Sequence, residues 1–92
     1  ARVDVKCGRN IRYAVPQYLE LYSEPDDVVI YARVQFPEEN VNVYLKQGER
    51  IIYRKRERLI RPGESLKLKL PQSEISGIRA EGDLELEIVK RE

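Results

Sequence analysis

A period-two alternation of apolar and polar residues recurs in four separate segments, and it constrains the fold of this chain more than any other feature. The clearest example is residues 28–36, where every second residue from Val28 to Phe36 is apolar. This period indicates strands with one buried and one solvated face, as in antiparallel sheets. The expected core positions are Val28, Ile30, Ala32, Val34, Phe36, Val41, Val43, Leu45, Leu66, Leu68, Leu70, Leu84, Leu86 and Ile88.

Turn sequences separate these segments at intervals of about 8–12 residues, the rhythm of sandwiches and barrels. They are residues 23–27, 37–40, 47–49 and 61–64, the last with the Pro-Gly order of a type II turn. We therefore predict one domain spanning residues 1–92. Its expected fold is an all-β antiparallel β-sandwich, immunoglobulin- or fibronectin-III-like, with about seven short strands.

Two segments depart from the simple pattern. In residues 50–60 the apolar side chains change face partway along, which either a bulge near Lys55 or a strand that crosses between sheets would explain. Residues 71–78 have Pro71 in an N1-like position and Gly77 as a stop signal, which predicts one turn of helix at most.

The composition argues against an enzyme. The chain has no His, its only cysteine is Cys7, and it lacks the glycine-rich fingerprints of nucleotide sites. We therefore predict no catalytic, cofactor-binding or metal-binding residues and no disulfide, and we interpret Cys7 as an inert thiol despite its neighbour Arg9. The single thiol predicts a cytoplasmic protein, and no apolar run is long enough for a membrane span.

Two further expectations concern the origin of the chain. The charged fraction of 36% resembles that of thermophile proteins. The chain starts at Ala1 and contains no Met, so it is either a product that lost its initiator Met or a domain of a longer protein.

Arg54, Arg56 and Arg58 share one face of a regular strand, with Lys55 on the other face. Such a row forms either an anion- or nucleic-acid-binding groove, or a solvated face whose arginines pair with acidic residues on neighbouring strands. The charges are balanced, with 17 basic and 16 acidic residues, so we favour the second interpretation and expect no nucleic-acid partner.

Two other candidate sites come from tyrosines and from acidic residues. Tyr31, Tyr44 and Tyr53 form either a partly covered patch that docks on a protein or ordinary packing on a sheet surface. The acidic residues of the 23–27 turn, Glu24, Asp26 and Asp27, have the oxygen ligands that calcium prefers but not the spacing of a known calcium loop.

The run of residues 7–17, together with Arg54 and the turn at 61–64, resembles the C-terminal β domain of bacterial FAD-dependent NAD(P)-type dehydrogenases, the pyridine nucleotide–disulfide-like oxidoreductases. The resemblance implies that FAD and NAD(P) bind in other domains of a longer protein. This chain would then be an accessory domain that packs on the catalytic domains or mediates assembly. The alternative is an independent protein-interaction module, which includes self-association.

Overall fold

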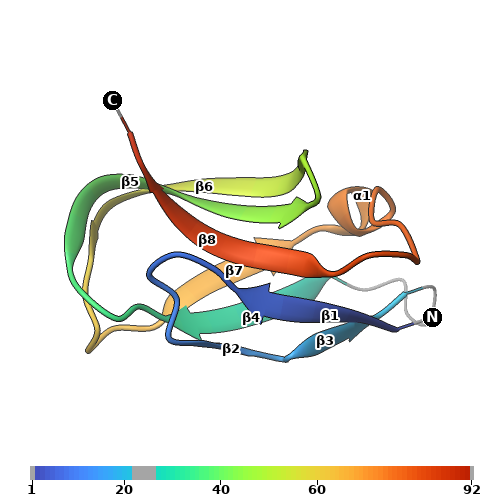
Figure 1. The fold of residues 1–92 in the computed structure, drawn as a ribbon, viewed down its shortest axis with the longest axis horizontal. Coiled ribbons are helices and arrows are strands. Elements are labelled where there is room, and N and C mark those ends of the chain that lie inside the picture. Colours follow the sequence, from blue (N-terminus) through green and yellow to red (C-terminus); the bar gives the residue numbers. More distant parts are fainter. Residues whose placement is uncertain (1, 22–26, 92) are drawn as a thin grey trace.

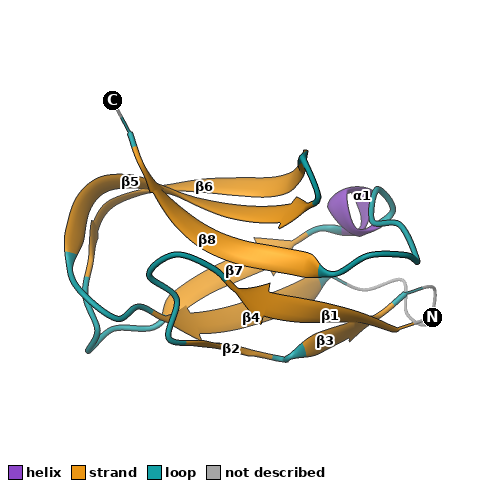
Figure 2. Ribbon diagram, viewed as in Figure 1, coloured by secondary structure: helices purple, strands orange, loops and turns teal. Residues whose placement is uncertain are grey.

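A computed structural model of the protein describes residues 2–21 and 27–91. These residues form eight strands and one short helix, drawn in Figure 1 and coloured by type in Figure 2. The elements are β1 (Arg2–Cys7), β2 (Tyr13–Val15), β3 (Tyr18–Glu20), β4 (Val28–Arg33), β5 (Glu38–Gln47), β6 (Arg50–Ile60), β7 (Leu66–Leu70), α1 (Gln72–Ile75) and β8 (Leu84–Lys90).

The strands form two sheets, one of five strands in the order β3-β1-β8-β5-β6 and one of three in the order β2-β4-β7. The all-β prediction is confirmed. The prediction of purely antiparallel pairing is wrong at one place, because β1 and β8 run parallel, with Val5 opposite Leu84. Periodicity within a strand carries no information about the direction of a partner that lies far away in the sequence.

Both sheets contribute to one apolar core. The predicted inward positions of β5 and β8 are fully buried, as are Ile30 and Ala32 of β4. Two predicted core positions differ. Val28 is only partly buried, and Phe36 is 43% exposed because β4 ends at Arg33.

The segment at 37–40 is not a turn, because β5 already begins at Glu38. The Glu38 carboxylate is buried and accepts hydrogen bonds from Arg9 and Asn10 in the loop that follows β1. These bonds hold the start of β5 in the sheet. The turn at 61–64 is confirmed by a hydrogen bond from Glu64 N to Arg61 O. Gly63 lacks the positive φ of a type II turn, so that assignment is wrong.

The irregular strand β6 contains a bulge, which was one of the two explanations that the sequence left open. The register shifts by one residue at Ile52, three residues before the expected position: Tyr53 lies opposite Leu45, and Ile51 lies opposite Lys46. The bulge lets the adjacent residues Ile52 and Tyr53 both pack on the core, which a regular strand would not allow. The single helical turn predicted at 71–78 is also confirmed as α1, with Pro71 as its N-cap.

Candidate functional site

The outer face of the five-stranded sheet carries the predicted arginine row. Arg54, Arg56 and Arg58 are all exposed on β6, the edge strand. The register places Tyr44 of β5 opposite Arg54 and Asn42 opposite Arg56. The row therefore lies beside neutral polar side chains and not beside carboxylates.

This register corrects the interpretation that the arginines pair with acidic residues on neighbouring strands. None of the three makes an ion pair with any residue in the described ranges. The acidic residue within β6, Glu57, instead pairs with Lys55 at 3.1 Å, and Lys55 donates to the carbonyl of Lys67 on β7. The guanidinium groups of the row are thus uncompensated.

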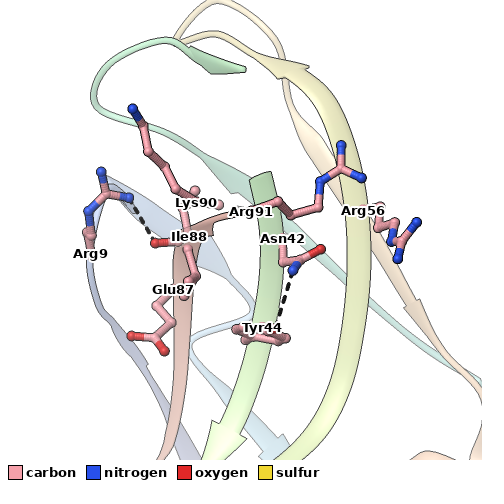
Figure 3. A pocket seen from close by; sticks show the side chains of 9 residues that line it. Arg9, Asn42, Tyr44, Arg56, Glu87, Ile88, Lys90 and Arg91 are labelled. Carbon is pink, nitrogen blue, oxygen red and sulfur yellow. Dashed lines mark hydrogen bonds between the residues drawn. The ribbon is translucent and has the colours of Figure 1, made fainter. Parts of the chain in front are cut away.

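A hollow of about 720 Å³ opens on this face, with Asn42 and Tyr44 among its lining residues (Figure 3). Four basic side chains also line the hollow, and Glu87 is its only acidic one in the part of the chain described. Glu87 already pairs with Lys46 at 2.7 Å, and this hydrogen bond raises the pKa of Lys46. The four basic residues are Arg9, Arg56, Lys90 and Arg91.

Two polar atoms of the hollow are buried without a hydrogen-bond partner among the described residues, Asn42 Oδ1 and Arg91 Nε. Another atom of each of these two side chains does make a hydrogen bond. Asn42 Nδ2 donates to Tyr44 OH at 3.3 Å (Figure 3), and Arg91 Nη2 donates to Asn40 Oδ1 at 3.4 Å. Buried polar atoms in folded proteins normally have partners, so each of these two atoms has an unused hydrogen-bonding position.

The loop after β1 places Arg9 at the edge of this hollow. Arg9 donates to both carboxylate oxygens of Glu38, at 2.9 and 2.8 Å, and to the carbonyl of Ile88. Asn10, with a φ of 57°, donates to Glu38 and accepts from the backbone N–H groups of Gln35 and Phe36. The hydrogen bond from Arg9 lowers the pKa of Glu38 and raises that of Arg9.

Gly8 explains how this loop passes β8. A Cβ at this position would lie 3.0 Å from Glu87 Cβ and 3.1 Å from atoms of the Glu85 side chain, so only glycine fits without displacing them. Cys7 beside it is exposed and free. The distinctive run at residues 7–10 therefore has a structural explanation in close approach, ion pairing and a left-handed turn.

The structure does not bring Tyr31, Tyr44 and Tyr53 together. Tyr44 lies on the outer face of the five-stranded sheet, and Tyr53 lies opposite Leu45 and packs on the core. Tyr31 lies on the outer face of the three-stranded sheet, directly opposite Val15. Its neighbours there, Val15 and Tyr13, were not chosen from the sequence, because the pairing of β2 with β4 brings them together.

Two of the acidic residues weighed as calcium ligands, Glu24 and Asp26, lie outside the described residues. The third, Asp27, lies 3.9 Å from Lys69 Nζ. Within residues 2–21 and 27–91 no group of three His, Cys, Asp or Glu side chains is placed to hold a metal ion. Over the same ranges no helix has the length and apolar character of a membrane span.

The basic residues contributed by the chain ends, Arg9, Lys90 and Arg91, were missed by sequence reasoning. No local pattern marks them. Lys90 and Arg91 reach the hollow through the pairing of β8 with β5, and Arg9 reaches it because the loop after β1 lies against β8. In comparisons with known proteins, the chain matches no family model, no curated protein and no solved structure.

Proposed function

We propose that this chain is a non-catalytic accessory domain, a β-sandwich of the immunoglobulin or fibronectin-III-like kind, in a larger cytoplasmic flavin-dependent oxidoreductase. It packs on the catalytic domains of that enzyme, which hold FAD and NAD(P), through the outer face of its three-stranded sheet. The observation that carries the docking role is a cluster of three exposed apolar side chains on that face, Tyr13, Val15 and Tyr31, which we call the β2–β4 patch.

The β2–β4 patch has the chemistry of a protein interface. Tyr13, Val15 and Tyr31 are 41%, 53% and 47% exposed. Val15 and Tyr31 are direct cross-strand partners, so their side chains form a continuous surface. Tyrosine is enriched at interfaces because it combines an apolar body with a polar tip. Covering one half-exposed tyrosine removes on the order of 100 Å² from water, which is worth about 2 kcal/mol.

The electrostatics favour a binding role over a catalytic one. Among the described residues three groups have shifted pKa values, Arg9, Glu38 and Lys46, and each lies in an ion pair that holds it in its charged form. General acid–base catalysis requires the opposite, a group whose pKa is moved toward the working pH. These ion pairs stabilise the loop after β1 and the β5–β8 pair, which is a structural task.

The parent enzyme is tested on the native gene product, isolated from its source with an antibody against this chain. We expect one polypeptide much heavier than 10.8 kDa that carries bound flavin. An intact mass near 10.8 kDa without flavin would refute the oxidoreductase.

The docking face is tested separately by hydroxyl-radical footprinting of the native product and of the 92-residue chain. Tyr13 and Tyr31 should be protected in the native product only. Tyr18 and Phe36, which are 40% and 43% exposed, are matched controls that should react equally in both. Equal reactivity of Tyr31 in both samples would rule out this face. A 10.8 kDa product that sediments as a dimer with Tyr31 protected would instead establish the alternative, an independent self-associating module.

A further inference from the structure

The outer face of the five-stranded sheet is a second binding surface, separate from the β2–β4 patch. Its boundary on one side is the arginine row of β6. Alternate residues of a strand lie about 6.6–6.8 Å apart, so Arg54, Arg56 and Arg58 present three positive charges at that spacing. None of them is neutralised by another described residue.

Basic residues also bound the other side. Lys90 and Arg91 come from the end of β8, and Arg9 comes from the loop after β1. Between the two sides lies β5, whose Asn42 and Tyr44 line the same hollow (Figure 3). We call this strip, with Arg56 on one side and Lys90 and Arg91 on the other, the β5 trough. Arg9 is already paired with Glu38, so Arg56, Lys90 and Arg91 are the charges that favour a negatively charged occupant.

The unpartnered atoms specify the occupant further. Arg56 and Arg91 Nε offer donors, which an anionic group would accept. Asn42 Oδ1 is an acceptor and requires a donor from the ligand. A polypeptide with acidic side chains supplies both, because its carboxylates accept and its backbone N–H groups donate. The phosphodiester backbone of a nucleic acid supplies acceptors only, so its donor would have to come from a base.

The remainder of the face also disfavours a long polyanion. Glu87 lines the hollow opposite Tyr44, Glu85 lies opposite Lys46, and the whole chain has a net charge of only +1. A long polyanion along the sheet would meet both carboxylates, whereas a short segment at the Asn42 end of β5 would lie between Arg56 and Arg91. Tyr44 is the only aromatic residue lining the hollow among the described residues, which leaves little for base stacking.

We infer that the β5 trough binds a short acidic segment of a protein partner in an extended conformation. Carboxylates of the segment contact Arg56 and Arg91, and a backbone N–H donates to Asn42 Oδ1. Glutamates at alternating positions have the spacing of the arginine row, so a second carboxylate reaches Arg54 or Arg58.

The test is fluorescence anisotropy with an end-capped, labelled peptide of seven residues in which glutamate and valine alternate. We expect binding that weakens with added salt. The substitutions Arg56→Gln and Arg91→Gln should each weaken binding about fivefold, the effect of losing one partly exposed ion pair. The double substitution should weaken it further, and Asn42→Ala should also reduce affinity because it removes the acceptor.

The matched control is Arg79→Gln, which removes the same charge from the loop between α1 and β8, outside the trough, and should leave the affinity within about twofold. A glutamine-for-glutamate peptide should not bind. Unchanged affinity in the double variant, with its urea midpoint equal to the parent's, would overturn the proposal. So would tighter binding of a single-stranded oligonucleotide or of inorganic phosphate than of the acidic peptide. None of these variants touches the β2–β4 patch, so either outcome leaves the proposed docking face to its own test.

Discussion

Asn10 is the residue whose substitution tests the loop after β1 most directly. Its side chain is 4% exposed and makes four hydrogen bonds: it donates to Phe36 O at 3.0 Å and to Glu38 Oε1 at 2.9 Å, and it accepts from the N–H groups of Gln35 and Phe36 at 2.9 Å each. Its backbone is in the left-handed region, with a φ of 57°. The side chain and the backbone can therefore be tested separately.

The substitution Asn10→Gly keeps the backbone conformation and removes all four bonds. At a net worth of about 1 kcal/mol each, it should lower the free energy of unfolding by about 3–4 kcal/mol. Compared with Asn10→Gly, the substitution Asn10→Ala keeps a Cβ at positive φ without the polar side chain that lets Asn adopt this conformation, a further cost of about 1–2 kcal/mol. The total free energy of unfolding of a domain is only about 5–15 kcal/mol, so both losses are large.

Asn40 is a matched control, because its φ is 52° but its side chain is exposed and makes one hydrogen bond of 3.4 Å, to Arg91. Asn40→Gly should leave stability within about 0.5 kcal/mol of the parent, and Asn40→Ala should cost about 1 kcal/mol. Urea denaturation followed by far-ultraviolet circular dichroism measures all four variants. If Asn10→Gly costs no more than Asn40→Gly, the hydrogen bonds of Asn10 do not stabilise the loop and the reasoning fails.

Two further predictions concern the same region. Folding lowers the pKa of Glu38 below its ordinary value of 4.5, so the unfolded chain binds more protons than the folded chain in the pH range between the two pKa values. The stability contributed by the Glu38 ion pair is therefore fully present above pH 4.5 and is lost as the pH falls through the folded-state pKa. Denaturation midpoints measured between about pH 3 and 7 should show this loss in the parent and a shallower one in Glu38→Gln; parallel profiles would contradict the role of the pair. Gly8→Ala forces a Cβ to 3.0 Å from Glu87 Cβ and should cost about 1–3 kcal/mol, whereas Gly63→Ala meets open space and should be neutral. Equal urea midpoints for the two variants would show that β8 accommodates the added Cβ without loss of stability, and would contradict this prediction.

The sequence alone predicted the strands whose inner faces form the core. The alternation around Val43, Leu68 and Leu86 is a local property, because successive side chains of a strand point to opposite faces whatever its neighbours are. The hairpin at Gly48, with a φ of 63°, and the single turn of helix α1 follow from equally local chemistry. The change of face in β6 also indicated an irregular strand, but the sequence left a bulge and a crossing between sheets as alternatives, and only the structure placed the bulge at Ile52.

Only the tertiary structure decided what lies beside each strand. The parallel pairing of β1 with β8 joins the two ends of the chain, and no local pattern encodes it. The neighbours of Arg56 are Asn42 and Arg91, not carboxylates, because β5 separates β6 from β8. Likewise Tyr31 and Tyr53 are both tyrosines within strands, but they lie on different sheets. Periodicity determines which side of a strand is buried, whereas sheet order determines which charges meet, and both candidate binding surfaces depend on sheet order.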